Sequence, residues 1–348
     1  MDEATLLALL KKGSQYRASD VLLKVGQPPA FRVNGDLHYL QGDKLKPSQT
    51  QGLAGIILKR SRYKGALDDL MEYDTSYGVE GVGRYRVNIY RQRGSIAMAL
   101  RAIPLKVPSF ADLRLPASIQ TLAEQERGLI LCVGAAGNGK STTLAAVVNH
   151  INQTRRAHVV TIEDPIEYMH QDKLAAISQR EIGLDTPSFA MALRAALRQD
   201  PDVILVGEIR DEETMDIALK AAETGHLVLS TLHTPDVSRT IGRVLALSGG
   251  GAEAAASTRE RFADNLKGIV AQRLLPTADN KGRVVAVEVL VMTGTARETI
   301  RRPEGNLPLK DVMERGVHPY GMQTFEMALK DLVQNGLIDV ETARAAMG

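Results

Sequence analysis

Residues 128–141 read GLILCVGAAGNGKS, an apolar run that passes directly into a glycine-rich loop. Residues 134–141 fit the pattern G-x-x-x-x-G-K-S/T, in which backbone N–H groups surround phosphate oxygens. The loop stands where this chemistry requires it, after a buried strand and before a helix that begins at Ser141. A plain glycine-rich turn is the competing interpretation. The context favours a P-loop that binds ATP and hydrolyses it.

Each part of this loop has a predicted role. The helix N-terminus adds the positive end of its dipole, Lys140 reaches the outer phosphates, and the Ser141 hydroxyl ligates Mg²⁺. The residues predicted to hold the nucleotide are Gly134, Ala135, Ala136, Gly137, Asn138, Gly139, Lys140, Ser141 and Thr142.

The chain that follows the loop alternates between apolar runs and amphipathic stretches. Parallel strands with helical crossovers produce this texture, and strands that are buried on both faces read as nearly continuous apolar runs. We therefore predict a doubly wound α/β fold. The predicted elements are strand LILCV, a helix from Ser141, strand HVVTI, helix SFAMALRAAL, strand VILVG, helix EETMDIALKAAET and strand LVLSTL.

Two predicted strands of this layer end in acidic residues. HVVTI is followed by Glu163, and VILVG by Glu208. Ligands bind at the carboxyl ends of parallel strands, so either carboxylate could orient or deprotonate the attacking water while the other holds the Mg²⁺ shell. Helix capping or an ordinary salt bridge is the alternative for each. We predict that both are catalytic and that Glu208, with Ser141, serves the metal.

Two histidines flank the strand LVLSTL. His226 precedes it and His233 follows it, seven positions later, so the two cannot form one zinc pair. A lone histidine is most often structural, and sensing of the phosphate is the functional alternative.

The first hundred residues have an α+β pattern. PAFRV and LHYL are joined by Asn34-Gly35, a strong hairpin signal. Further on, GRYRVNIY alternates, with Arg84, Arg86 and Asn88 on one face and apolar residues on the other. Together with Arg91, Arg93 and Arg101, these arginines form either a solvated or nucleic-acid-binding face, or arginine fingers, some of which reach the γ-phosphate when domains close.

The remaining segments set the predicted domain limits. Three prolines interrupt residues 104–118, which we interpret as a linker between an N-terminal domain (1–103) and an ATPase core (119–292). The C-terminal region (293–348) is predicted to be helical. Beyond Pro235 we expect mainly helix apart from VVAVEVLV, with the stretch around Gly249–Gly251 and the following alanines forming a flexible loop.

Composition excludes several classes of protein. The net charge is +2, Trp is absent and Phe numbers five, so neither a global positive field nor aromatic stacking platforms favour nucleic acid. One cysteine, Cys132, excludes a disulfide framework and a four-cysteine zinc site, and it is expected to be a core residue. No export signal or spanning segment is recognised, so we expect a soluble, cytoplasmic protein.

Four motifs in order resemble the PilT/PilU retraction ATPases of type IV pili, within the secretion ATPase superfamily. GAAGNGKSTT is similar to their Walker A motif, TIEDPIEY to the aspartate box, PDVILVGEIRD to Walker B and TGHLVLSTLHT to the histidine box. SDVLLKVGQPPAFRVNGDL resembles the PAS-like domain, VGRYRVNIY the arginine-bearing strand, and GMQTFEMAL the C-terminal helices. The resemblance covers nearly the whole chain and implies a RecA-like P-loop core.

The resemblance also implies roles for particular residues. Glu163 and Glu208 would be the catalytic carboxylates, and His226 and His233 would respond to the state of the nucleotide. Arg84, Arg86 and Arg101 would be the candidate catalytic arginines.

The same resemblance implies partners and a location. The implied partners are further copies of the chain in a homohexameric ring, an inner-membrane platform protein and, as a further candidate, a PilT/PilU paralogue. The implied location is the cytoplasmic face of the inner membrane. Membrane association would come only through the machine. TARETIRR stands where PilT proteins have a motif close to AIRNLIRE, and QREIGLDTPSF, EETMD and GRVVAVEVLV favour PilU. An ATP-gated adaptor without turnover and a nucleic-acid translocase are the alternatives.

Overall fold

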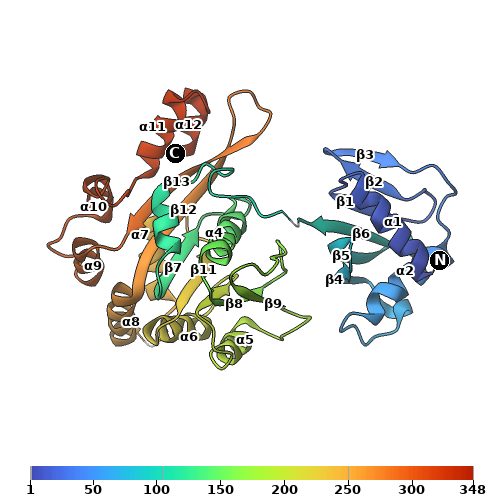
Figure 1. The fold of residues 1–348 in the computed structure, drawn as a ribbon, viewed down its shortest axis with the longest axis horizontal. Helices are drawn as coiled ribbons and strands as arrows, with labels where there is room; N and C mark the ends of the chain where they lie inside the picture. The colour runs from blue at the N-terminus through green and yellow to red at the C-terminus, as the bar shows by residue number, and fades with distance from the viewer. Residues whose placement is uncertain (1, 105, 250, 348) are drawn as a thin grey trace. The chain divides into compact units, whose positions relative to one another are not determined.

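The computed structural model describes residues 2–104, 106–249 and 251–347, so parts of the linker and glycine-run predictions, at positions 105 and 250, lie outside the described residues. The chain forms two compact units (Figure 1). The first comprises Met1–Lys106 with two short segments, Asp164–Met169 and Glu181–Pro187. The second comprises Val107–Glu163, His170–Arg180 and Ser188–Gly348. Residues 164–169 and 181–187, which were predicted to belong to the ATPase core, are therefore grouped with the N-terminal unit by their contacts.

The first unit is built on a six-stranded antiparallel sheet of order β3-β2-β1-β6-β5-β4. The predicted hairpin is confirmed: Asn34 and Gly35 both have positive φ, as its two-residue turn requires. The elements are α1 (Glu3–Gln15), β1 (Asp20–Leu23), β2 (Ala30–Val33), β3 (Asp36–Tyr39), α2 (Pro47–Lys59), the short 3₁₀ helix η1 (Leu67–Asp69), β4 (Glu72–Val79), β5 (Gly83–Gln92) and β6 (Ser95–Ile103).

The alternation along β5 matches its burial. Tyr85, Val87 and Ile89 are buried in the core of the first unit, whereas Arg86 is exposed and Arg84 is half-buried. The α1 and α2 helices pack on the same core through Leu6, Leu53 and other apolar side chains. The predicted α+β domain is therefore present.

The second unit is built on a seven-stranded sheet of order β13-β12-β7-β11-β10-β8-β9. Neighbours from β12 to β8 run parallel, and β13 is antiparallel to β12. The bounds are β7 (Gly128–Val133), β8 (His158–Glu163), β9 (Ala176–Glu181), β10 (Val203–Val206), β11 (Leu227–Leu232), β12 (Leu266–Pro276) and β13 (Arg283–Val291). Every residue of β7, β10 and β11 is buried, which is why their sequences are almost continuously apolar, with Ser230 and Thr231 as the polar residues of β11.

Helices cover both faces of this sheet, as the doubly wound prediction requires (Figure 1). Parallel crossovers are right-handed, and the chain moves from β7 to β8 in one direction but from β8 back to β11 in the other, so α4 lies on the face opposite α5 and α6. The helices are α3 (Ala117–Ala123), α4 (Lys140–Thr154), α5 (Phe189–Ala196), α6 (Glu212–Glu223), α7 (Val237–Ala246), α8 (Gly251–Asn265), α9 (Gly294–Arg301), α10 (Leu309–Arg315), α11 (Phe325–Gln334) and α12 (Val340–Met347).

Two predictions for the later part of the core are wrong. The segment LKGIVAQRLLP, expected to be helical, is β12, because it pairs on both sides with β7 and β13. The alanine-rich segment that was expected to be a flexible loop is α8, which is consistent with the high helix propensity of alanine.

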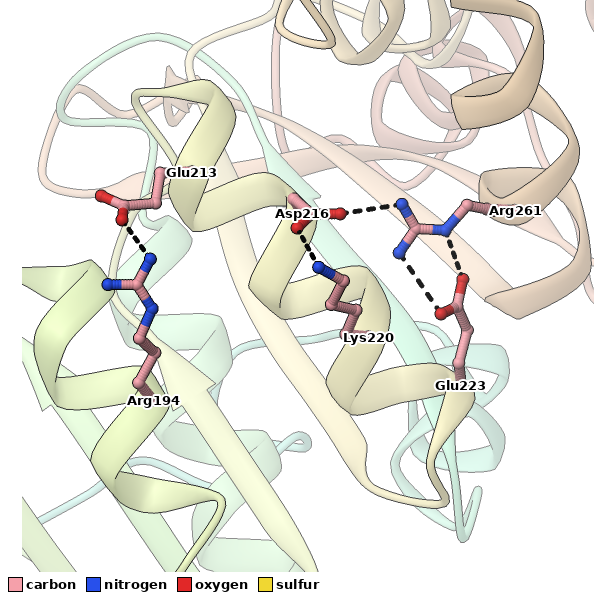
Figure 2. A network of polar contacts seen from close by, with 6 residues as sticks. All are labelled: Arg194, Glu213, Asp216, Lys220, Glu223 and Arg261. Atoms are coloured by element: carbon pink, nitrogen blue, oxygen red, sulfur yellow. Dashed lines mark hydrogen bonds and ion pairs between the residues drawn. The ribbon is translucent and has the colours of Figure 1, made fainter. Parts of the chain in front are cut away.

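Ion pairs hold α8 against α6 (Figure 2). The Arg261 guanidinium donates to Glu223 through Nε at 2.6 Å and to Asp216 through Nη1 at 2.9 Å. Asp216 also pairs with Lys220 at 2.7 Å. Hydrogen bonding to Glu223 is the main cause that raises the pKa of Arg261. A two-partner pairing of this kind fixes the orientation of the helix as well as its position.

None of the helices in the described ranges is long and apolar enough to cross a membrane.

Candidate active site

The glycine-rich loop follows the last residue of β7, and its backbone requires glycine. Gly134, Gly137 and Gly139 all have positive φ, with Gly139 in the left-handed conformation as the residue before α4. A Cβ on Gly134 would lie 2.6 Å from the carbonyl oxygen of Gln272. The loop therefore lies directly against β12, and the first turn of α4 follows it as an anion site demands.

Lys140 is folded back over this loop. Its ammonium donates to the carbonyl oxygens of Gly134 at 2.8 Å and Ala135 at 3.0 Å, and the residue is 8% exposed. The ammonium thus lies against the first residues of the loop, which is the part of the chain that binds phosphates in P-loops. Asn138 fastens the other side, because its Oδ1 accepts from the N–H of Leu274 on β12 at 3.2 Å.

Gln272 lies behind the loop and connects it to α4. Its amide donates to the Thr143 hydroxyl at 2.9 Å and accepts from the Cys132 thiol at 2.7 Å. Cys132 is a buried core residue as predicted, and burial raises the pKa of its thiol to about 12. The thiol therefore stays protonated and serves as a hydrogen-bond donor.

Glu163 ends β8, and the partners of its carboxylate include two neutral donors. The Thr161 hydroxyl donates to its Oε1 at 2.6 Å, and the Gln179 amide of β9 donates to the same oxygen at 3.0 Å. Thr161 is fully buried, and Gln179 is itself anchored by the backbone N–H of His170 at 2.9 Å. The carboxylate thus has a defined orientation at the carboxyl edge of the sheet.

Glu208 follows β10 and is paired with basic side chains. Its Oε1 lies 3.0 Å from His233 Nε2, and its Oε2 lies 2.8 Å from Arg210 Nε. The backbone around it is pinned, since the Thr231 hydroxyl donates to the Gly207 carbonyl at 2.7 Å. Glu208 is mostly buried, whereas the side chains of Arg210 and His233 are 60% and 48% exposed.

The two histidines that flank β11 lie at opposite ends of that strand. His233 lies at its carboxyl end beside Glu208, at the same sheet edge as the P-loop. His226 lies before its amino end, where its Nδ1 is 3.0 Å from the Ala221 carbonyl oxygen, and six strand residues span about 20 Å. The structure therefore brings His233 to the site and leaves His226 at the opposite edge.

The candidate arginines belong to the first unit. Arg84 donates to Ser76 at 2.8 Å and to Glu181 at 3.0 Å, and Glu181 is almost fully buried. Arg86 is exposed and lies opposite Arg101 in the sheet, and Arg101 pairs with Asp20 at 2.8 Å. Arg84 thus holds Glu181, the last residue of β9, which is a role that the sequence did not indicate.

A cavity of about 590 Å³ lies at the end of β12, and its lining includes Leu274, the residue that bonds to Asn138. Leu274, Leu337, Val284 and Val285 supply apolar walls. Arg114 and Arg283 line it together with the acids Asp112 and Asp279, so the lining carries both signs of charge. Its size is within the range of small-molecule sites.

Three comparisons with known proteins identify the same protein family for this chain. Residues 109–316 match the type II/IV secretion system protein family. The chain is 40% identical over 344 residues to both the type IV pilus ATPase PilU and the type IV pilus retraction ATPase PilT of Pseudomonas aeruginosa. The matches cover 99% of this chain, with 87% of PilU and 97% of PilT. The chain belongs to the PilT/PilU family.

A solved member of the PilT/PilU family has the same fold. The crystal structure of the pilus retraction motor PilT with bound ADP matches with a TM-score of 0.86 and 43% identity, covering 98% of this chain and 96% of that one. The resemblance drawn from the four motifs is therefore confirmed, as is the α/β P-loop fold. That relative binds ADP, which supports nucleotide binding by the family's P-loop.

The sequence analysis did not identify several residues that contact the P-loop or the two candidate catalytic carboxylates. Gln179 and Thr161 hold Glu163, Arg210 contacts Glu208, and Gln272 supports the P-loop. Thr161 could have been found, since it precedes Glu163 by two positions and therefore shares its face of the strand. Gln179 and Gln272 carry no local signal, because their partners are distant in the sequence.

Proposed function

We propose that this chain is a Mg²⁺-dependent ATPase that works as a homohexameric ring and powers or assists the retraction of type IV pili. The observation that carries the proposal is the gathering of a P-loop, Glu163, Glu208 and His233 at one edge of a parallel sheet. The chain is equally identical to PilU and to PilT, which supports a role in pilus retraction. Experiment must decide between the PilU-type and the PilT-type role.

In the proposed reaction the loop glycines and α4 bind the β- and γ-phosphates, and Lys140 turns from the loop carbonyls toward them. Glu163 or Glu208 orients the attacking water and takes its proton, and the other carboxylate stabilises the remaining charge. His233, which already contacts Glu208, is placed to respond to a change at the γ-phosphate.

Ser141 and Glu208 would hold Mg²⁺. Their hydroxyl and carboxylate oxygens are the donors that this ion prefers, and it commonly takes only one or two protein ligands beside phosphates and water. The described residues accordingly need no cluster of three acidic, histidine or cysteine ligands, and they contain none. When bound, the ion neutralises developing charge on the phosphates.

The cavity at the end of β12 is proposed to receive the nucleoside. Asn138 joins the phosphate loop to Leu274, which lines that cavity, so a nucleotide extended from the loop along this contact enters it. Leu274→Trp would fill the cavity and weaken ATP more than inorganic pyrophosphate, which occupies only the loop.

The wider assignment concerns the ring and its partners. We infer that the chain works at the cytoplasmic face of the inner membrane with a platform protein and a PilT/PilU paralogue, without binding nucleic acid. Arg84, Arg86, Arg101 and His226 remain candidates for contacts that couple ATP turnover to movement in the ring.

Phosphate release by the purified chain tests the enzymatic part. We expect steady Mg²⁺-dependent turnover that Lys140→Ala abolishes by loss of nucleotide binding. Absence of turnover at saturating Mg-ATP, with ATP still bound, would replace the motor with the ATP-gated adaptor. Stimulation by DNA would favour a translocase instead.

Retraction of labelled pili in a strain that lacks the gene tests the biological part. Loss of all retraction would assign a PilT-type motor, and loss only under load or only together with a paralogue would assign a PilU-type accessory. Unchanged retraction in every combination would overturn the assignment to pili.

A further inference from the structure

The Gln179 side chain connects Glu163 to a backbone group on the neighbouring loop. Its Nε2 donates to Glu163 Oε1 at 3.0 Å, and its own Oε1 accepts from the N–H of His170 at 2.9 Å. A backbone N–H can only donate, so it fixes which end of the amide is oxygen. The Nε2 group must therefore face the Glu163 carboxylate.

A second donor converges on the same carboxylate oxygen. The Thr161 hydroxyl lies 2.6 Å from Glu163 Oε1, and Thr161 is fully buried within β8. The two donors approach from different strands, β8 and β9. Together they restrict a side chain that otherwise has three rotatable bonds, and both prefer an ionised acceptor.

We propose that Gln179 is a positioning residue for the catalytic carboxylate of Glu163, with Thr161 as its partner. The inference rests on the proposed ATPase function. A carboxylate that orients water must lie within hydrogen-bond reach of it, and a misplacement of about 1 Å can cost about a hundredfold in rate. Gln179 acts through Glu163 and touches neither nucleotide nor water in this role.

A purely structural role for Gln179 is the competing interpretation. β9 is an edge strand of the sheet, and the Gln179–His170 contact also fastens the loop that precedes it. A structural role predicts that loss of the side chain weakens folding and ATP binding alike. A positioning role predicts a loss confined to kcat.

Gln179→Met tests the proposal in the full chain, because methionine has a similar length and no amide. We expect kcat for Mg-ATP to fall about tenfold, the effect of losing a hydrogen bond to a charged group, with KM and the affinity for a non-hydrolysable ATP analogue unchanged. Ser178→Ala is the matched control. Ser178 is the adjacent residue on β9 and contacts His158 rather than Glu163, so kcat should stay at the wild-type value.

The Glu163→Gln background separates the two proposals. If Glu163→Gln turns over like the wild type, the catalytic role of Glu163 fails, whatever Gln179 does. If Glu163→Gln is defective and Gln179→Met has wild-type kcat, only the positioning role fails. In single-turnover assays Gln179→Met should add no further loss to Glu163→Gln, and an equal loss in both backgrounds would overturn the proposal.

Thr161→Val keeps the test independent of how well Gln179→Met folds. Valine keeps the branched shape and removes only the hydroxyl that donates to Glu163. The proposal requires the same pattern, a lower kcat with unchanged ATP-analogue affinity. Wild-type kcat in Thr161→Val, or a loss of ATP-analogue affinity as large as the loss of kcat, would contradict it.

Discussion

The ends of β8 and β10 carry the two candidate catalytic carboxylates and hold them in different ways. The partners of Glu163 Oε1 include a buried threonine on its own strand and a glutamine that a backbone group anchors. Glu208 contacts Arg210 and His233, whose side chains are largely exposed. Buried, mutually bonded groups keep one arrangement, whereas exposed basic side chains can move when a ligand competes for the carboxylate.

This difference indicates a division of labour between the two strand ends. The β8 end presents a carboxylate that a buried threonine and an anchored glutamine orient, which is the arrangement expected of a group that orients water. The β10 end presents a carboxylate whose basic partners can exchange for Mg²⁺. This arrangement is expected of a group whose contacts change when Mg²⁺ and nucleotide bind.

The largest expected effect comes from neutralising either carboxylate. Glu163→Gln should lower kcat by about a thousandfold, within the range attributed to general bases, with ATP affinity retained. Glu208→Gln should also stall turnover with ATP bound, but only Glu208→Gln should raise the Mg²⁺ concentration needed for half-maximal binding. Glu213→Gln, an exposed acid on α6, is the control. Equal Mg²⁺ dependence in the two variants would remove the division of labour.

Acid should lower the free energy of unfolding through His170, which lies in the loop between β8 and β9. Burial lowers the pKa of His170 to about 4, from an ordinary value of 6.5. The unfolded chain therefore binds more protons between these values, so stability is full above about pH 6.5 and falls by about 3 kcal/mol as the pH drops to 4. Urea unfolding from pH 7 to 4 measures this slope, and His170→Phe should flatten it. An unchanged slope would show that other groups control acid stability.

A smaller effect is expected from the partner of Glu208. His233→Phe keeps the ring and removes the nitrogen that lies 3.0 Å from Glu208. We expect kcat to fall about tenfold, since one charge-assisted contact is lost while both carboxylates remain. Steady-state phosphate release measures it. Wild-type kcat in His233→Phe would remove the histidine from the response to nucleotide.

The smallest effect is expected at the other edge of the sheet. His226→Phe should leave the affinity for ATP within twofold of the wild type, because His226 contacts Ala221 and lies a full strand length from the P-loop. Equilibrium binding of a fluorescent ATP analogue measures it. A tenfold change would mean that His226 reaches a nucleotide by a route absent from the single chain.

The sequence predicted the parts of the fold that local patterns determine. β7, β10 and β11 are buried on both faces, and their nearly continuous apolar runs were recognised as strands. β12 was missed because Lys267, Gln272 and Arg273 interrupt its pattern. Gln272 is 1% exposed, yet its partners Cys132 and Thr143 lie more than a hundred residues earlier.

The same distinction applies to the candidate site. The P-loop and both carboxylates follow from strand ends, which are visible in the sequence. Gln179 was missed because β9 itself was not predicted, and its pattern of alternating exposure gives no long apolar run. The alanine-rich start of α8 was missed because three adjacent glycines resemble a loop, whereas the ion pairs of Arg261 that hold the helix come from α6.

The contact between Gly134 and β12 has a consequence for synthesis of the chain. The P-loop motif leaves the ribosome well over a hundred residues before Gln272, whose carbonyl lies against Gly134, and before Leu274, which bonds to Asn138. A nascent chain that ends before Leu266 contains every residue of the phosphate-binding motif but lacks β12, the strand against which the loop packs. We therefore expect the P-loop to reach its final shape only after β12 has been synthesised and has paired with β7.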